Sequence, residues 1–224
     1  MREIVLDTET TGLDPDSGHR IVEIACVELV HRLPTGREFR KHVNPERDMP
    51  EAAQAIHGLS TEFLAEQPPF AAIVEEFLEF IGEAPLVIHN AEFDLKFLNA
   101  ELARLGRPAI DAARAVDTVA LARQRFPGAQ ASLDALCRRF EIDNSARDLH
   151  GALLDCQLLA EVYLELSGGR QPGFDLDPAR RAQALAVGRQ ERPQRPARPH
   201  APSPEETVAH EALLAHMKDP IWHQ

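Results

Sequence analysis

Near its amino terminus the chain reads IVLDTETTG over residues 4–12. The three apolar residues predict the start of a buried strand, and because side chains alternate along a strand, Asp7 and Glu9 point to the same side. Two carboxylates about 7 Å apart at the end of a buried strand repel each other unless a cation lies between them. The stretch therefore favours a divalent metal site, and two solvated acids at a strand end are the alternative.

Length and charge limit the classes to which the chain can belong. It has 224 residues, of which 44% are hydrophobic, enough for one large domain or one domain with an appendage. The net charge of -12 argues against a free-standing, tight, non-specific binder of nucleic acid. No apolar run reaches the ~20 residues of a membrane span, and no signal pattern opens the chain, so no membrane contact is expected.

The cysteines point to a reducing compartment. Cys26, Cys137 and Cys156 are an odd set without CxxC spacing, so neither a disulfide framework nor a structural zinc site is indicated. A cytoplasmic location is expected.

The order of predicted elements is typical of an α/β domain. The pattern predicts strands from residue 4 and at 21–30 and 38–43 with a turn at 34–36, helices at 50–58, from 60 and at 70–81, a strand at 85–88, and helices at 91–105, 117–125, 132–140 and 150–166. Asn90 is expected to cap the helix that begins at residue 91. A strand meander followed by strands alternating with helices predicts a mixed sheet flanked by helices.

The composition changes after residue 168. Residues 169–204 contain many Pro and Arg and few large apolar side chains, so they are expected to form a flexible linker between a domain at 1–168 and a helix within 205–224. Leu213, Leu214 and Met217 form a small apolar stripe on that helix, with Trp222 beyond it. A single helix of this length is marginal alone, so it is expected to dock on something.

Three further residues stand where a metal site needs them: Asp94 after the strand at 85–88, and His150 and Asp155 at the start of the last domain helix. With them the sequence resembles the DEDDh family of 3′→5′ exonucleases. The family's three motifs are matched by residues 7–12, 89–94 and 150–155. The resemblance covers about residues 1–167 and implies an RNase H-like fold with a five-stranded mixed sheet.

The resemblance also implies two divalent metal ions, Mg²⁺ or Mn²⁺. Four carboxylates without a thiolate suit such hard ions, and two ions can stabilise the attacking and leaving oxygens of a phosphodiester. By resemblance Asp7 bridges the two ions, Glu9 and Asp155 complete one site, and Asp94 holds the other partly through water. His150 is implied to be the general base; an exposed histidine near a helix start is the alternative.

Weaker matches to the family concern the residues that contact the nucleotide. Thr10, Gly12 and Leu13 match family positions that contact the 3′-terminal nucleotide, with simple turn chemistry as the alternative. His57 matches a position that lines the nucleotide pocket. The alternative is a histidine whose position at the carboxyl end of a helix is favoured by the helix dipole.

The appendage resembles that of the epsilon proofreading subunits of bacterial DNA polymerase III. In those subunits the tail attaches to the polymerase alpha subunit, which implies docking through the stripe and Trp222, or a helix folded on its own domain. A glutamine-led peptide there contacts the sliding clamp. Gln171, Phe174 and Leu176 match it loosely, and packing back on the domain is the alternative.

The expected function is metal-dependent removal of mismatched 3′-terminal nucleotides from DNA as nucleoside 5′-monophosphates. A frayed or single-stranded 3′ end reaches such a site without the cost of unpairing. A chain with a net charge of -12 is expected to bind DNA weakly by itself, so a partner that holds the DNA would raise the local concentration of substrate. The alternatives are a stand-alone trimmer of the RNase T or oligoribonuclease type and a non-catalytic scaffold that stabilises a polymerase.

Overall fold

The computed structural model describes residues 1–145, 149–169 and 201–217, which fall into two units, Met1–Gly173 and Phe174–Gln224. The expected clamp peptide (Gln171, Phe174 and Leu176) and Trp222 lie outside the described residues. Each unit is described by itself.

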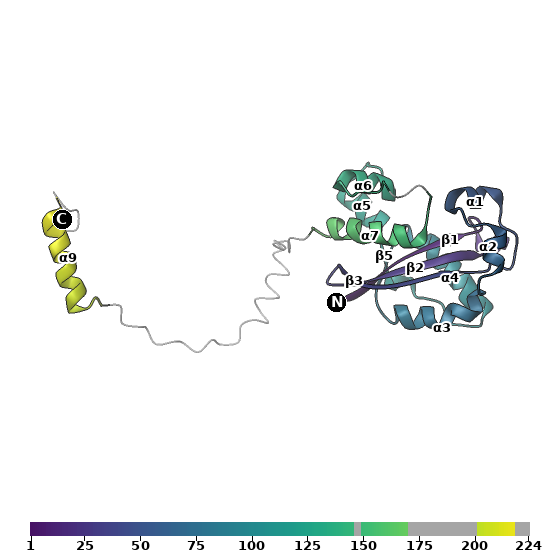
Figure 1. Ribbon diagram of the computed structural model, residues 1–224, viewed down its shortest axis with the longest axis horizontal. Coiled ribbons are helices and arrows are strands. Elements are labelled where there is room, and N and C mark those ends of the chain that lie inside the picture. Colours follow the sequence, from purple (N-terminus) through teal and green to yellow (C-terminus); the bar gives the residue numbers. More distant parts are fainter. Residues whose placement is uncertain (146–148, 170–200, 218–224) are drawn as a thin grey trace. The chain divides into compact units, whose positions relative to one another are not determined.

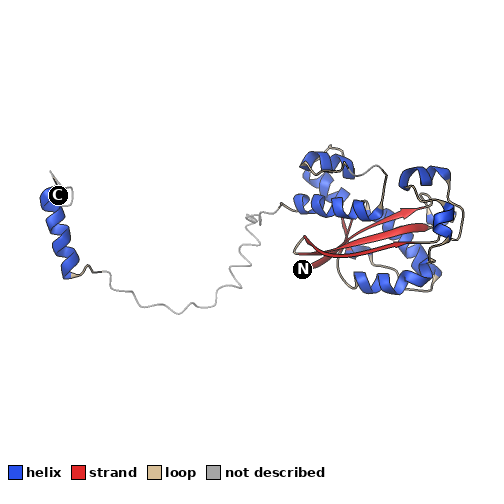
Figure 2. Ribbon diagram, in the orientation of Figure 1, coloured by secondary structure: helices blue, strands red, loops and turns tan. Residues whose placement is uncertain are grey.

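The first unit is built on a mixed five-stranded sheet, as predicted. Its strands are β1 (Arg2–Thr10), β2 (Ile21–Val30), β3 (Leu33–His42), β4 (Leu86–Ile88) and β5 (Ala115–Asp117), in the spatial order β3-β2-β1-β4-β5. The first three strands form an antiparallel meander (Figures 1 and 2). In contrast, β4 pairs in parallel with β1, and β5 in parallel with β4. The long strand β1 therefore lies at the centre of the sheet.

Helices cover both faces of this sheet (Figure 1). The helices of the first unit are α1 (Glu51–His57), α2 (Thr61–Ala65), α3 (Phe70–Ile81), α4 (Ala91–Arg104), α5 (Thr118–Arg125), α6 (Leu133–Phe140) and α7 (Ala152–Leu166), with 3-10 turns η1 (Pro15–Ser17) and η2 (Ala112–Arg114). Ile4 and Leu6 of β1 pack in the core with α3 and α4, whereas Val5 packs in the core with α5, α6 and α7. This alternation decides which face of the sheet each β1 side chain reaches.

The predicted turn at 34–36 is wrong. The strands β2 and β3 are joined at His31 and Arg32, both of which have positive φ, at 54° and 65°, while Pro34 already pairs with Leu29. Positive φ at both central residues is the geometry of a two-residue hairpin that matches the sheet twist. Pro34 is tolerated because β3 is an edge strand, where a missing N–H leaves no ladder bond unmade.

Asn90 is the N-cap residue of α4, as predicted, but its side chain does not cap the helix. Asn90 precedes α4 but has a left-handed conformation, with φ 69°, and its side chain makes no capping hydrogen bond. Its backbone N–H instead donates to Asp117 Oδ1 at 3.1 Å, and the same oxygen accepts the Val119 N–H at 2.9 Å to cap α5. Asp117 therefore joins the ends of β4 and β5.

The second unit contains α9 (Pro204–His216), close to the helix expected from residue 205. Ser203 and Glu206 form a reciprocal capping box at its start. Of the expected stripe, Leu214 is buried, whereas Leu213 and Met217 are exposed. Among the residues that the structure describes, none of the helices has the length and apolarity needed to cross a membrane.

The core under α3 yields a prediction for stability. Phe77 is fully buried and packs against Phe39, with ring centroids 5.9 Å apart. Phe77→Ala is expected to lower the free energy of unfolding by about 3–5 kcal/mol, because it leaves a cavity in a close-packed interior. Phe63→Ala is the matched control, since that ring is 41% exposed, and should cost about 1 kcal/mol or less. Urea unfolding measures both, and equal losses would contradict the prediction.

Candidate active site

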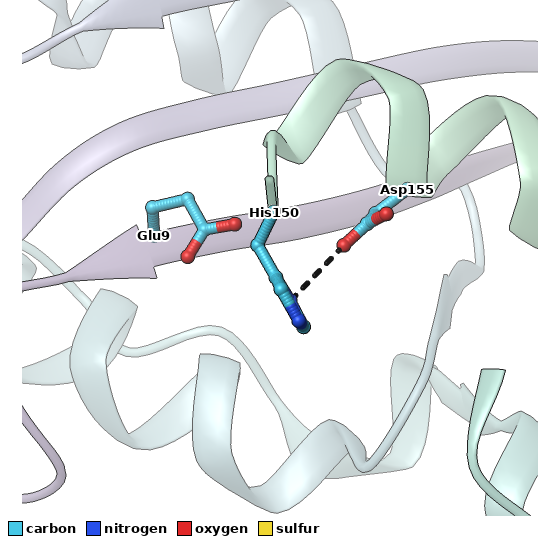
Figure 3. A group of neighbouring side chains, drawn as sticks. All are labelled: Glu9, His150 and Asp155. Carbon is cyan, nitrogen blue, oxygen red and sulfur yellow. Dashed lines mark ion pairs between the residues drawn. The ribbon is translucent and has the colours of Figure 1, made fainter. Parts of the chain in front are cut away.

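Glu9, His150 and Asp155 form one cluster at the end of β1. Each offers one possible ligand atom, and these atoms all lie within 4.8 Å of one another. Glu9 comes from the strand, His150 from the segment that leads into α7, and Asp155 from the first turn of α7, and the three side chains converge (Figure 3). His150 Nδ1 lies 3.6 Å from Asp155 Oδ2, and His150 is half exposed whereas both acids are buried.

Strand alternation and helix packing together build this cluster. Glu9 and Val5 are four residues apart in β1, so their side chains lie on the same face of the sheet. Val5 packs against α7 on that face. The first turn of α7 packs on the same face through Ala152 and Cys156, both fully buried. Asp155 therefore lies near the end of β1 on the face of the sheet that α7 covers.

Asp94 approaches β1 from the opposite face. Its Oδ1 accepts two hydrogen bonds from Thr8, one from the backbone N–H at 3.0 Å and one from the hydroxyl at 2.6 Å. Burial raises the pKa of Asp94 to about 7, although the two bonds from Thr8 oppose this shift. Sequence reasoning missed Thr8; its place between Asp7 and Glu9, with its side chain on the α4 side, was the available signal.

The remaining acid, Asp7, lies on the same face of β1 as Glu9 and is half-buried. Burial raises the pKa of Cys156, and the charges of Asp7, Asp94 and Asp155 raise it further. These three carboxylates therefore all lie close enough to act on one thiol. Asp94 and Asp7 stand outside the 4.8 Å cluster but belong to the same acidic end of β1.

The donor set fits divalent cations. Three of the four carboxylates are buried: Glu9 is 9% exposed, Asp94 3% and Asp155 5%. Buried carboxylates this close together are costly unless positive charge compensates them. Carboxylate oxygens, with one imidazole and no thiolate in the cluster, suit hard ions such as Mg²⁺ or Mn²⁺ rather than a structural zinc.

A cavity of about 630 Å³ opens beside the acids, and Glu9 is part of its wall. All four residues expected to contact a nucleotide, Thr10, Gly12, Leu13 and His57, line it. Leu13 is 84% exposed at this wall, so its apolar side chain is accessible to a ligand in the cavity.

Phe93 contributes both to the core and to the wall of this cavity. Its ring packs against that of Phe97, with centroids 5.0 Å apart, and it also lines the cavity together with Ile56. Phe97 is fully buried. The i, i+4 spacing on α4 brings the two rings together.

His57 presents a neutral ring to this cavity. Its Nδ1 accepts the Leu59 N–H at 3.1 Å, so the proton lies on Nε2. Burial lowers the pKa of His57, which keeps the imidazole uncharged at neutral pH. An uncharged ring suits packing against a nucleobase.

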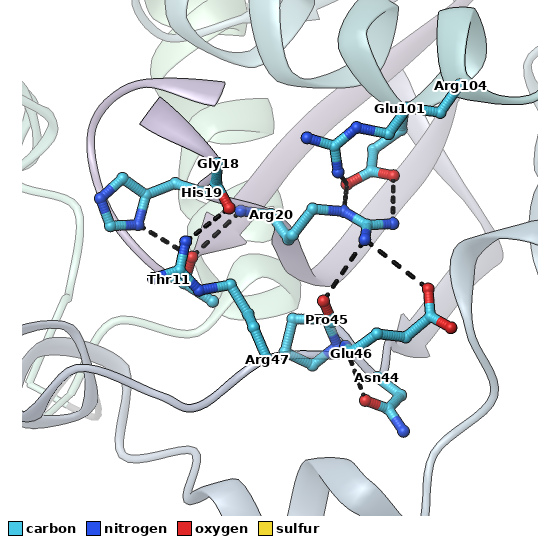
Figure 4. A network of polar contacts seen from close by, with 10 residues as sticks. All are labelled: Thr11, Gly18, His19, Arg20, Asn44, Pro45, Glu46, Arg47, Glu101 and Arg104. Atoms are coloured by element: carbon cyan, nitrogen blue, oxygen red, sulfur yellow. Dashed lines mark hydrogen bonds and ion pairs between the residues drawn. The ribbon is translucent and has the colours of Figure 1, made fainter. Parts of the chain in front are cut away.

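The loop that follows β1 is held to α4 by a polar network (Figure 4). Thr11 and Arg20 exchange hydrogen bonds, since the Thr11 N–H donates to the Arg20 carbonyl at 2.9 Å and the Arg20 N–H to Thr11 Oγ1 at 3.0 Å. The guanidinium of Arg20 then donates to both oxygens of buried Glu101 on α4, at 2.5 and 2.8 Å. The network therefore fixes the strand that carries Asp7 relative to the helix that carries Asp94.

Gly12 is required by the same network. A Cβ at Gly12 would lie 2.6 Å from Nε2 of His19 and still closer to the rest of that ring, which Thr11 Oγ1 holds at 3.0 Å. Gly12→Ala is therefore expected to lower the free energy of unfolding by about 1–3 kcal/mol through overpacking. His19→Ala should restore most of this loss in the double variant. Chemical denaturation of the two single variants and the double variant measures the coupling, and additive losses would contradict it.

Comparison with known proteins agrees with this geometry. The sequence matches the exonuclease (RNase T) family over residues 4–163. It is 58% identical over 179 residues to the DNA polymerase III subunit epsilon of Rickettsia felis, a match that covers 79% of this chain and 78% of the relative. It is 49% identical over 176 residues to the subunit of the same name from Escherichia coli, which covers 75% of this chain and 72% of the relative.

Solved structures show the same fold. Exonuclease X in complex with 5′ overhanging duplex DNA matches with a TM-score of 0.56 and 27% identity, over 73% of this chain and 89% of that one. The nuclease domain of 3′hExo, a DEDDh family member bound to rAMP, matches with a TM-score of 0.64 and 19% identity, over 75% and 92% of the two chains. The chain therefore belongs to the exonuclease family, and within it to the DNA polymerase III epsilon subunits.

Proposed function

We propose that this chain is a metal-dependent 3′→5′ exonuclease that removes mismatched 3′-terminal nucleotides from DNA as nucleoside 5′-monophosphates, as the proofreading subunit of a DNA polymerase III. The observation that carries this proposal is the cluster of Glu9, His150 and Asp155 within 4.8 Å, next to a cavity of nucleotide size.

The four carboxylates have the role of metal ligands. Asp7, Glu9, Asp94 and Asp155 would hold two ions, Mg²⁺ or Mn²⁺. Two such ions would supply positive charge to the attacking and leaving oxygens of the scissile phosphodiester. Thr8 supports this arrangement because its two hydrogen bonds hold one oxygen of Asp94 and leave the other oxygen for a ligand.

His150 has the role of general base. A neutral imidazole at this position can take the proton of the attacking water, and the Asp155 carboxylate lies 3.6 Å from its Nδ1. The half-exposed position of the ring gives the accepted proton a route to solvent.

The cavity has the role of holding the 3′-terminal nucleotide. Leu13, Ile56 and Phe93 supply apolar surface for the base, and Thr10 and Gly12 bring backbone close to the sugar. A single-stranded or frayed end enters such a pocket without an unpairing cost, which favours mismatched termini.

The residues after the domain have the role of partner contacts. In this proposal the chain divides into a nuclease domain at 1–168, a linker at 169–204 and a docking tail at 205–224. Leu213, Leu214, Met217 and Trp222 would dock on the polymerase alpha subunit, and Gln171, Phe174 and Leu176 on the sliding clamp. Tethering to a DNA-bound partner raises the local concentration of DNA and so compensates for the weak DNA binding expected at a net charge of -12.

The test is degradation of a 3′-labelled DNA primer, paired or mismatched at its end, by the full chain and by Asp7→Ala. With Mg²⁺ or Mn²⁺, wild type is expected to release single nucleotides, faster from the mismatch, and chelation should stop the reaction. RNA of the same sequence is assayed in parallel. No cleavage of DNA, or equal cleavage by both proteins, would contradict the proposal, and cleavage of RNA alone would favour a stand-alone trimmer.

A further inference from the structure

Glu23 on β2 is a buried carboxylate with three contacts, one of which is His42 Nε2 at 3.3 Å from Oε1. Its side chain is only 2% exposed. Oε1 accepts the Nε–H of Arg40 at 2.7 Å, and Oε2 accepts the backbone N–H of Ala152 at 3.2 Å. A buried carboxylate is costly unless it is paired and hydrogen-bonded, and these contacts meet both needs. The bond to Ala152 joins parts of the chain that are far apart in sequence.

Ala152 opens α7, where the first backbone N–H groups have no partner within the helix. The preceding residue, Gly151, has no side chain with which to cap them. Glu23 supplies this cap from a neighbouring strand, and its negative charge also suits the positive end of the helix dipole. The start of α7 is therefore held by the sheet rather than by its own N-cap residue.

Glu23 also connects the two halves of the active site. In the β1–β2 register it lies directly opposite Glu9, so the two side chains share one face of the sheet. On the helix side, Ala152 lies between His150 and Asp155 in the chain. Glu23 thus links the strand that carries one member of the cluster to the turn that carries the other two.

The backbone before α7 has a second anchor. The His150 N–H donates to the carbonyl of Ile56 on α1 at 3.0 Å. The His150 side chain is 51% exposed and lies 3.6 Å from Asp155. The anchors of its backbone, at Ile56 on one side and at Glu23 on the other, fix the point from which this side chain starts.

We propose that Glu23 is a positioning residue of the exonuclease site, which holds the first turn of α7, and with it His150 and Asp155, against the strand that carries Glu9. The inference rests on the proposed function. Both oxygens of Glu23 are engaged by Arg40 and Ala152, so it acts through the helix and not as a further metal ligand. The hydrogen bond from Arg40 holds the carboxylate in place.

Glu28 offers a matched control on the same strand. It too is buried, and its carboxylate accepts hydrogen bonds from Arg2 at 2.6 Å and Arg37 at 2.9 Å. Its partner in the β1–β2 register is Ile4, at the other end of β1 from the acids. Loss of Glu28 removes an equally buried ion pair without touching α7.

The experiment compares full-length wild type, Glu23→Leu, Glu23→Gln and Glu28→Leu in steady-state release of nucleotides from single-stranded DNA. Glu23→Leu is expected to lower kcat about 10²-fold with KM within about threefold, because misplaced catalytic groups slow chemistry while the nucleotide cavity is kept. Glu23→Gln keeps an oxygen that can accept the Ala152 N–H and should recover to within about tenfold of wild type. Glu28→Leu should keep its kcat. Hydrogen exchange in the peptide that contains Ala152 should quicken in Glu23→Leu alone.

A kcat of Glu23→Leu close to that of wild type, or an equal loss in Glu28→Leu, overturns the role of Glu23. If Glu23→Leu does not fold, Glu23→Gln is compared with Glu28→Gln, where a lower kcat of Glu23→Gln supports the role and equal values overturn it. Wild type without nucleotide release overturns the proposed function and the role of Glu23 with it. If wild type and Glu23→Leu release nucleotides at the same rate, the role of Glu23 is overturned but the proposed function is not.

Discussion

Asp155→Asn is expected to reduce the rate of nucleotide release about 10³-fold, because a bound metal ion supplies several kcal/mol of stabilisation to the transition state and this change removes one of its carboxylates. The substitution keeps the size of the side chain in a position that is 5% exposed, so the fold should persist. Single-turnover degradation of single-stranded DNA with saturating Mg²⁺ measures the loss.

Thermal unfolding separates this loss from misfolding. Without metal, Asp155→Asn should unfold at the same temperature as wild type or a higher one, because it removes one of several buried like charges. With Mg²⁺ or Mn²⁺ it should gain less stability than wild type, since an ion that binds only the folded state stabilises in proportion to its affinity. Glu161→Gln, exposed on the same helix, is the control and should leave rate and stability unchanged. A rate within about tenfold of wild type would mean that Asp155 is not a metal ligand.

The site acids could be predicted from sequence because each lies at the end of an element whose period is visible. Alternation in β1 places Asp7 and Glu9 on one face, and helical spacing at the start of α7 places Asp155 on the turn that packs there. Their meeting is a consequence of topology, which the order of strands and helices indicated. For that reason the mixed sheet and the exonuclease family were both predictable.

The parts that could not be predicted depend on contacts between distant segments. The strand β5 has three residues, too few for any period, and it exists because Leu86 of β4 pairs with Ala115. The hairpin at His31 and Arg32 contains neither Gly nor Asn, so no local signal marks it. Likewise nothing in the sequence near Glu23 indicates that it caps a helix that begins at Ala152.

For Asp94, the motif predicted the position in the chain but not the contacts of the side chain. Its place after β4 was predictable, but its approach to β1 from the face opposite to Asp155 is set by its two hydrogen bonds with Thr8. Burial then raises its pKa to about 7 when no cation is bound. A motif predicts a candidate ligand, whereas the burial and hydrogen bonds of the folded chain determine its pKa.

His150→Ala is expected to slow nucleotide release about 10²–10⁴-fold, the range that a positioned general base contributes. The side chain is half exposed, so its removal should change the free energy of unfolding little. The geometry places His150 close enough to Glu9 and Asp155 to be either a base or a further metal ligand. The two roles predict different responses to metal, which gives the variant a second readout.

A general base leaves the metal site intact when it is removed. His150→Ala should therefore keep the full rise in thermal stability that Mn²⁺ gives to wild type, whereas Asp155→Asn should lose part of it. Loss of that rise in His150→Ala would identify His150 as a ligand instead. His210→Ala, an exposed histidine on α9, is the matched control and should match wild type in both rate and stability. A wild-type rate in His150→Ala would leave the activation of water to another group of the site.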